Sequence, residues 1–546
     1  MVAEAALVGN VDQRHGGGGQ QLLAVVDAGL IDVVRDAHTR LLLEDTAEVG
    51  LAEIDLPGDL LQRDAAQAVA ADIVHGLEHD VGVADVRVVE GDGDELLNDR
   101  REPTAQLDAG MRLACMAQIC GPNADIELPQ EGRMLVETGL PLQRLEWAPW
   151  AAGLGLSVDI GTTTVAAYLW DLDGRRQLGV MSCKNPQERL GADVVSRLDA
   201  SLAGRGGELR RCMTACLAEL AEGLCRQVGR PVTDIGGAVI TGNTAMLYLL
   251  RELDVHDIAL APFQARHRFG EYLPAAALGL HWAPDCRVYL PPCISAYVGA
   301  DITCGLLACG ALQAEGPALL ADVGTNGEMA LLSGGAIHCC ATAAGPAFEG
   351  VGISCGSGAV PGAIDAVTAE DGALHVHVIG GGEARSLCGS GLLDAVAALR
   401  RLELVEDSGF MEEDSLPLSG SAALLRRDIR AFQLAKSAIC AGVDTLLHTA
   451  GVRASEVKTV WLAGGFGCKL SPESAGAVGM LPLALAPSVW PVGNAAAAGA
   501  ALLLCSRRFE TEAADITAAA RVVELAADPV FQERFIEDML LAEVTE

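Results

Sequence analysis

The sequence predicts an α/β protein built from two similar lobes, because one pattern of segments occurs twice in the same order. The first observation is a pair of expected β-hairpins with polar, glycine-containing tips, at 156–170 and 319–332. The second is a pair of expected helices rich in small residues, at 300–305 and 495–501, each preceded by Val-Gly. Like elements in a like order indicate an internal duplication.

Length and composition agree with a large folded protein. Half of the 546 residues are hydrophobic, and the formal net charge of -35 repels nucleic-acid backbones and anionic lipid surfaces. The sequence has neither an apolar run long enough for a membrane span nor the basic and apolar parts of a secretory signal at its start. The 17 cysteines, an odd number in a long chain, fit reduced thiols. We therefore expect a cytoplasmic protein without nucleic-acid or membrane partners.

Residues 1–108 differ from the rest of the chain. They are strongly acidic, and the first hundred contain a glycine run at 16–19 but neither lysine nor cysteine. Two interpretations stay open: a poorly ordered acidic extension, or a small acidic α/β domain.

The hairpin tips have the composition of phosphate-binding loops. Backbone N–H groups and hydroxyls donate hydrogen bonds there, and glycine lets a phosphate approach the main chain. Two such tips that faced each other would clamp a polyphosphate. The residues concerned are Gly161, Thr162, Thr163 and Thr164 in the first tip, and Gly324, Thr325, Asn326 and Gly327 in the second.

One aspartate precedes each tip, Asp159 in the first hairpin and Asp322 in the second. Carboxylates are hard oxygen ligands that hold Mg²⁺ directly or through water, and they also orient an attacking water. A single Asp-x-Gly-Thr is usually only a turn, but the duplicated pair at strand ends favours a site. Both aspartates are our candidate catalytic and magnesium-binding residues.

A third element is the apolar segment 460–463, which runs into Gly464, Gly465 and Phe466. Glycines allow a base and ribose to lie flat against the backbone, so this turn is a candidate adenosine site. In the first half, the expected strand 237–240 leads to Gly242 and Asn243. These residues either cap the next helix or face the nucleotide, and both readings stay open. The small-residue helices are likewise either a hinge or a tightly packed core.

These segments resemble the ASKHA superfamily, the fold of actin, sugar kinases and the Hsp70 ATPase, with two RNase H-like lobes around a nucleotide cleft. Within it, the chain is similar over residues 153–546 to the ASKHA domain of reductive activators of corrinoid enzymes. The superfamily likeness rests on Asp159-Ile-Gly-Thr-Thr-Thr, Gly242-Asn243-Thr244, Asp322-Val-Gly-Thr-Asn-Gly-Glu328 and Leu462-Ala-Gly-Gly-Phe-Gly467. The narrower likeness rests on Asn185-Pro186-Gln187, Gly191-Ala-Asp-Val-Val-Ser-Arg197, Cys340-Ala-Thr-Ala-Ala-Gly-Pro-Ala-Phe-Glu-Gly350, Cys388-Gly-Ser-Gly-Leu-Leu-Asp394 and Asp428-Ile-Arg-Ala-Phe-Gln-Leu-Ala-Lys436.

The resemblance implies an ATPase whose cycle drives a low-potential electron onto a Co(II) corrinoid, returning it to Co(I) for methyl transfer. The implied cofactors are ATP and Mg²⁺, and the implied partner is a corrinoid protein or corrinoid-dependent methyltransferase. It also suggests a division of the chain into a ferredoxin remnant (109–130), a linker (131–152), lobe I (153–317), lobe II (318–505) and a helical tail (506–546).

Such proteins usually begin with a [2Fe-2S] ferredoxin domain. Residues 110–115 and 125–129 resemble the C-terminal edge of that domain, with Cys115 as its last cluster ligand. No cysteine precedes Cys115, however, and one thiolate cannot hold a cluster that takes four ligands. Either the N-terminus has been replaced, for instance through a wrong reading frame, or an external donor supplies the electron.

Three further readings stay open at this point. A small-molecule kinase of the same fold would need a base, for which Glu328 or Asp301 is placed. An activator of a 2-hydroxyacyl-CoA dehydratase would bridge a [4Fe-4S] cluster between two subunits, with Cys388 and Cys440 as the matching thiols, so a homodimer is also open. A non-hydrolysing nucleotide-dependent partner protein is the third.

The missing cysteines generate a direct prediction. After anaerobic purification, iron and acid-labile sulfide should fall far below the roughly two of each per chain that a [2Fe-2S] cluster brings. Colorimetric iron and sulfide assays check this, and a full complement of both would contradict it.

Overall fold

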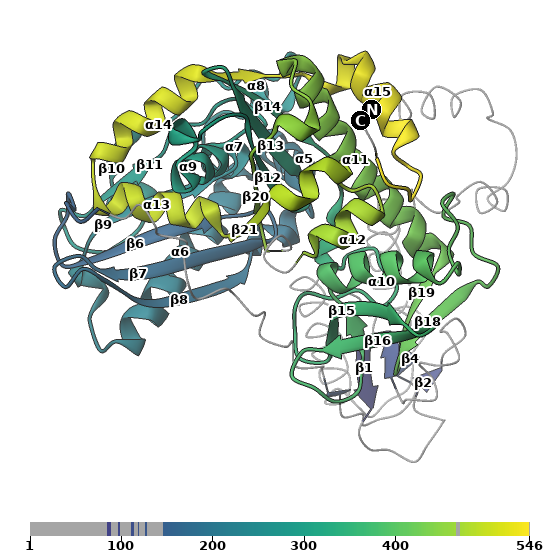
Figure 1. Ribbon diagram of the computed structural model, residues 1–546. Helices are drawn as coiled ribbons and strands as arrows, with labels where there is room; N and C mark the ends of the chain where they lie inside the picture. The colour runs from purple at the N-terminus through teal and green to yellow at the C-terminus, as the bar shows by residue number, and fades with distance from the viewer. Residues whose placement is uncertain are drawn as a thin grey trace, which may run out of the picture. The chain divides into compact units, whose positions relative to one another are not determined.

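The computed structural model describes residues 85–88, 97–98, 111–113, 118–119, 126–127, 146–465 and 470–544. Two six-stranded mixed sheets dominate this part of the chain (Figure 1). Each contains an antiparallel three-stranded meander, and the first strand of the meander pairs parallel with the next strand of the sheet.

The first sheet has the strand order β10-β11-β9-β6-β7-β8. Strands β6 and β7 form the first predicted hairpin, and β9 pairs parallel with β6. Helix α6 (Gly206–Gln227) packs on this sheet through an apolar stripe at helical spacing that includes Leu209, Met213 and Leu220. The strands are β6 (Leu154–Ile160), β7 (Thr164–Asp171), β8 (Arg176–Lys184), β9 (Ile235–Gly242), β10 (Glu271–Pro274) and β11 (Arg287–Leu290).

The second sheet has the order β21-β20-β12-β13-β14-β22; its first five strands correspond to β11-β9-β6-β7-β8, and its sixth strand lies at the opposite edge. Strands β12 and β13 form the second predicted hairpin, and β20 pairs parallel with β12 as β9 does with β6. The expected duplication of the fold is thereby confirmed. The strands are β12 (Ala318–Val323), β13 (Gly327–Ser333), β14 (Ala336–Thr342), β20 (Thr459–Ala463), β21 (Val489–Gly493) and β22 (Ala520–Val522). Strand β22 comes from the segment expected to be a helical tail.

Helices α9 (Ala300–Cys309) and α13 (Ala495–Cys505) are the two predicted small-residue helices, and they lie against each other (Figure 1). Helix α13 contacts β6 and β9 of the first sheet, while α9 contacts β12 and β13 of the second. One apolar cluster therefore joins side chains of both sheets, including Trp170 and Leu320. The helices are thus the packed core between the lobes.

Residues 363–425 form an insertion that the sequence did not predict. Helix α10 (Gly389–Arg401) covers a small sheet of β15 (Ala363–Glu370), β16 (Ala373–Val378) and β17 (Ser386–Leu387) (Figure 1). A further hairpin consists of β18 (Ser415–Ser419) and β19 (Ala422–Leu425).

Helix α11 (Arg426–Ala450) holds the C-terminal segment in place through buried polar side chains. Gln433 Nε2 donates to Met539 O (2.7 Å), and Lys436 Nζ donates to the carbonyls of Gly479 and Leu540. Because these bonds satisfy backbone carbonyls of Met539 and Leu540, they make the segment after α15 (Pro529–Glu537) part of the fold rather than a loose end.

The other described helices are α5 (Val194–Ala200), α7 (Thr244–Arg251), α8 (His256–Ala259), α12 (Pro472–Ala477) and α14 (Arg508–Ala519). None of the described helices has both the length and the apolar character needed to span a membrane.

Short strands near the N-terminus cross the expected boundary at residue 108. Strand β1 (Asp85–Val88) pairs antiparallel with β3 (Met111–Leu113) and β5 (Ile126–Glu127), and β2 (Leu97–Asn98) pairs with β4 (Gln118–Ile119). The rest of 1–108, on which two readings stayed open, lies outside the described residues, as does Cys115.

The closest approach of the lobe-joining helices is at Gly499. A Cβ atom added there would lie 2.0 Å from the carbonyl oxygen of Cys304. We expect Gly499→Ala to force α9 and α13 apart and to destabilise the protein by about 1–3 kcal/mol. The measurement is thermal or urea unfolding.

Gly207→Ala in α6 is the matched control, since its Cβ would meet only the ends of the flexible Glu252 and Arg211 side chains. It should leave stability unchanged or raise it. Equal stability of the Gly499→Ala variant and the wild type would contradict the tight helix contact.

Candidate functional site

The two predicted aspartates occupy equivalent positions near the ends of the two central strands. Asp159 on β6 lies opposite Ala166 of β7 and beside Thr241 of β9. Asp322 on β12 lies opposite Glu328 of β13 and beside Ala463 of β20. The duplication therefore presents one carboxylate per lobe at the same end of each sheet.

Four carboxylates influence one another at this point. Burial raises the pKa of Asp322 to about 8, and the charges of Asp301 and Asp159 raise it further. Burial and Asp301 together raise the pKa of Asp159 to about 7. Burial raises the pKa of Asp301, in the first turn of α9, to about 6, and that of Glu328 well above its usual range. The four carboxylates therefore lie near enough to one another for their charges to interact.

The carboxylate group fits a divalent cation. Asn494, the N-cap of α13, donates from Nδ2 to Asp159 Oδ2 (3.0 Å), but this donor is neutral. Within residues 146–465 and 470–544, none of the four acids forms an ion pair with lysine or arginine. A hard cation such as Mg²⁺ would relieve the repulsion, because it prefers carboxylate oxygens and water.

The first tip is held by a network of amide side chains. Asn185 Nδ2 donates to Gly161 O (2.8 Å), and the Asn185 backbone N–H donates to Thr163 O (2.7 Å). Asn243 caps the next helix, which is one of the two readings that stayed open, and its side chain also contacts the first tip; that it faces the nucleotide stays a prediction. Its Oδ1 accepts from Met246 N and caps α7, while its Nδ2 donates to Thr162 Oγ1 (3.1 Å).

The two tips meet through their threonines and through Glu349, which ends the short 3-10 helix Pro346–Glu349. The hydroxyl oxygens of Thr163 and Thr325 are 3.3 Å apart. Glu349 Oε2 accepts from Thr163 Oγ1 (2.7 Å), and its Oε1 accepts from Thr325 N and Oγ1 (both 2.8 Å). Hydroxyl and amide donors of both lobes thus converge, as the polyphosphate hypothesis requires.

Glycine is needed where the third element meets the second tip. Gly464 has a φ of +94°, and a Cβ there would lie 2.6 Å from Val323 O and 2.8 Å from Asp322 Oδ1. Gly242 at the end of β9 would similarly bring a Cβ to 2.6 Å from Ile160 O. Gly465 is exposed with open space around its Cα, whereas Phe466 lies outside the described residues.

The structure therefore brings the sequence-predicted tips and aspartates together, with Gly464 against Asp322. Three residues that sequence reasoning did not assign to this site also belong to it: Glu349, Asn494 and Asp301. Asn494 directly follows one of the Val-Gly pairs that were matched between the halves, and Asp301 lies two residues after the other. Glu349 lies in a motif quoted only for the family likeness. Asp301 was considered only as a kinase base.

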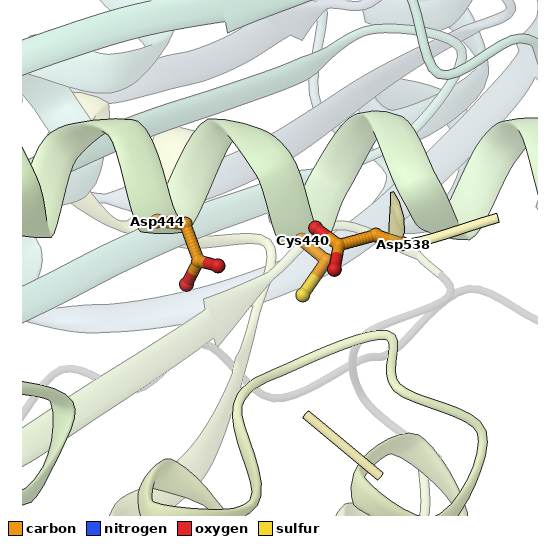
Figure 2. A group of neighbouring side chains, drawn as sticks. All are labelled: Cys440, Asp444 and Asp538. Atoms are coloured by element: carbon orange, nitrogen blue, oxygen red, sulfur yellow. The ribbon is translucent and has the colours of Figure 1, made fainter. Parts of the chain in front are cut away.

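Most of the described cysteines are buried. Cys440 on α11 lies near Asp444 and Asp538, with the possible ligand atoms within 4.8 Å of one another (Figure 2). Arg534 pairs with Asp444 (3.6 Å), and the charge of Lys436 acts on Asp538, so cations of the chain already balance this group. It joins α11 to the C-terminal segment.

Cys388 lies apart from Cys440, in a small apolar cluster with Ala363 and Ile379. Their exposed fractions are 4% for Cys388 and 0% for Cys440. A cluster shared between two subunits needs thiols at a surface, so this arrangement does not favour the dehydratase-activator reading.

The fold and the paired tips define a protein of the ASKHA class. Residues 316–546 match the family described as the C-terminal domain of RACo, the ASKHA domain, and residues 154–314 match the RACo middle region. The chain belongs to this RACo family of reductive activators of corrinoid proteins, and the expected family is confirmed.

Known relatives agree with this assignment. The chain is 32% identical to the corrinoid activation enzyme RamQ of Eubacterium limosum over 71% of this chain and 70% of that protein. It is 26% identical to a methylated amine-specific corrinoid protein reductase of Methanosarcina barkeri over 60% of this chain and 66% of that protein. A solved reductive activator for a corrinoid, iron-sulfur protein matches with a TM-score of 0.67 and 26% identity, over 85% of this chain and 92% of that chain.

The carboxylate cluster predicts an unusual pH dependence of stability. Folding raises the pKa of Asp322 from 3.8 to about 8, so the folded protein keeps a proton that the unfolded chain loses. This group therefore makes folding less favourable as the pH rises from about 4 to about 8. With divalent cations removed by EDTA, Asp322→Asn should raise the melting temperature by at least about 2 °C, more at pH 8 than at pH 5.

Asp199→Asn, at an exposed carboxylate on α5, is the control and should change little at either pH. A loss of stability in the Asp322→Asn variant at pH 8 would show that the carboxylates are not repelling one another.

Proposed function

We propose that this protein is an ATP-dependent reductive activator that returns a corrinoid protein from Co(II) to Co(I). The observation that carries the proposal is the meeting of the two tips, each with its aspartate, in a chain of the RACo family. Corrinoid activation by RamQ supports the same assignment.

In this proposal different residues of the site bind different parts of the nucleotide. Thr163 and Thr325, with the backbone N–H groups of the tips, bind the phosphates. Asp159 and Asp322 hold Mg²⁺ and orient water. When bound, Mg²⁺ neutralises phosphate charge and polarises the phosphoryl oxygens. Gly464 and Gly465 receive the adenosine: the space beside Gly465 is open, while Gly464 lets the turn lie close against Val323 and Asp322.

ATP favours an uphill reduction only if its binding or hydrolysis discriminates between two states of the protein. The tips belong to different lobes, and the lobes pack on each other through α9 and α13. A ligand that engages both tips therefore acts on the relative position of the lobes. We propose that ATP hydrolysis acts on the bound corrinoid partner through this change in the relative position of the lobes.

The electron comes from outside the chain in this proposal. No cysteine precedes Cys115, so this sequence lacks the three upstream ligands of a plant-type cluster, and a separate low-potential protein or chemical reductant supplies the electron.

The kinase alternative depends on a carboxylate base, for which Glu328 and Asp301 are the candidates. Burial raises the pKa of Glu328 well above its usual range, so this side chain is protonated at neutral pH and is poorly suited as a base. Burial raises the pKa of Asp301 only to about 6, so this carboxylate is ionised at neutral pH and is suited to act as a base. We propose the activator function over the kinase because the relatives of this chain are corrinoid-activating enzymes.

The test is anaerobic ATP hydrolysis with a Co(II) corrinoid protein and a low-potential reductant, followed by the visible spectrum of the corrinoid. We expect ATP-dependent formation of Co(I), and a loss of roughly 100-fold or more in hydrolysis and Co(I) formation for Asp322→Asn.

Asp199→Asn should retain both activities. Hydrolysis without any corrinoid response would exclude the activator function while keeping an ASKHA ATPase. Unchanged Co(I) formation by Asp322→Asn would show that the protein acts as a nucleotide-binding partner only.

A further inference from the structure

Glu349 is the one carboxylate seen to bond to both tips in the described part of the chain. Its two oxygens accept three hydrogen bonds, from Thr163 Oγ1 and from the backbone N–H and hydroxyl of Thr325, at 2.7–2.8 Å. An anion that accepts from hydroxyl and amide donors in this way has the contacts of a bound phosphate group.

We propose that Glu349 is an internal competitor for the phosphate site: its carboxylate occupies the tip donors, and the nucleotide's phosphates must displace it. This inference rests on the proposed function, because it concerns the same donors. Glu349 then acts as a latch between the lobes that nucleotide binding releases.

The tip donors have too few protons to bond to the Glu349 carboxylate and to a phosphate at the same time. A threonine hydroxyl has one proton, and the backbone N–H of Thr325 has one. While these protons are given to Glu349, the hydroxyls of Thr163 and Thr325 have none left for a phosphate. A phosphate that uses them must therefore break the bonds to Glu349.

Electrostatic repulsion also favours displacement of Glu349 when a phosphate binds. Asp159, Asp301, Asp322 and Glu328 already repel one another at this site. A polyphosphate that arrived beside a fifth carboxylate would be repelled further, so moving Glu349 away relieves the repulsion.

The short helix that carries Glu349 packs against α11, and this packing fixes where the latch begins. The preceding Phe348 is buried and meets Phe432 of α11 edge-on, with ring centroids 5.7 Å apart. The Gly345 N–H donates to Thr325 O (2.9 Å), so the segment that carries Glu349 is also tied to the second tip. Displacing the side chain therefore needs only rotation about its own bonds, and the short helix can stay in place.

The experiment measures the affinity of the full chain for three ligands by isothermal titration calorimetry in the presence of Mg²⁺. The ligands are inorganic tripolyphosphate, ADP and adenosine. Glu349→Ala should bind tripolyphosphate and ADP about tenfold more tightly than the wild type, because the competing acceptor is gone. Its affinity for adenosine, which lacks phosphate, should not change.

Two further variants make the result specific. Glu349→Gln keeps the side-chain volume but removes the charge, so its affinity for tripolyphosphate should fall between those of the wild type and Glu349→Ala. Glu383→Ala removes an exposed carboxylate of the same lobe, and it should bind like the wild type. Circular dichroism and thermal unfolding establish that each variant is folded.

Unchanged or weaker binding of tripolyphosphate and ADP by both Glu349 variants would overturn the latch, since Glu349 would then support phosphate binding. An equal gain for adenosine would also overturn it, because the effect would not depend on phosphate. If neither the wild type nor any variant binds ADP, the proposed function fails and the latch fails with it. Wild-type binding of ADP without a gain in the variants removes the latch alone.

Discussion

The site depends on the direct backbone contact between α9 and α13. Each helix leaves the sheet of one lobe and packs on the sheet of the other, and Gly499 brings α13 against the Cys304 carbonyl. The N-termini of these helices carry Asp301 and Asn494 into the carboxylate group. A larger residue at the contact would therefore disturb both the core between the lobes and the position of two polar side chains at the site.

A second constraint follows from that geometry, because two equivalent strand ends bring like charges together. Burial and mutual repulsion favour the protonated forms of Asp159 and Asp322 near neutral pH. The arrangement is unfavourable for the fold by itself and becomes favourable when a cation is bound. The carboxylate cluster thus lowers the stability of the folded protein and provides a cation-binding site in return, as expected for a functional site.

The sequence predicts the parts of this protein that repeat. Each predicted feature occurs in both halves of the chain, so its presence in one half supports its prediction in the other. These features are the hairpins, the central aspartates, the tip threonines and the small-residue helices. Glu349 has no counterpart that the repeat identifies, so its contact with both tips appears only in three dimensions. The insertion at 363–425 was missed for the same reason, and short strands there carry only a weak periodic signal.

Coupling between nucleotide and partner requires that the two lobes respond together to one ligand. The bonds from Thr163 and Thr325 to Glu349 already span the lobes, so the resting structure has a defined interlobe contact at the phosphate site. The α9 and α13 contact is apolar and close, and it joins side chains of both lobes. A rigid apolar contact beside an exchangeable polar one is the arrangement by which a small change at the phosphates shifts the balance between two lobe positions.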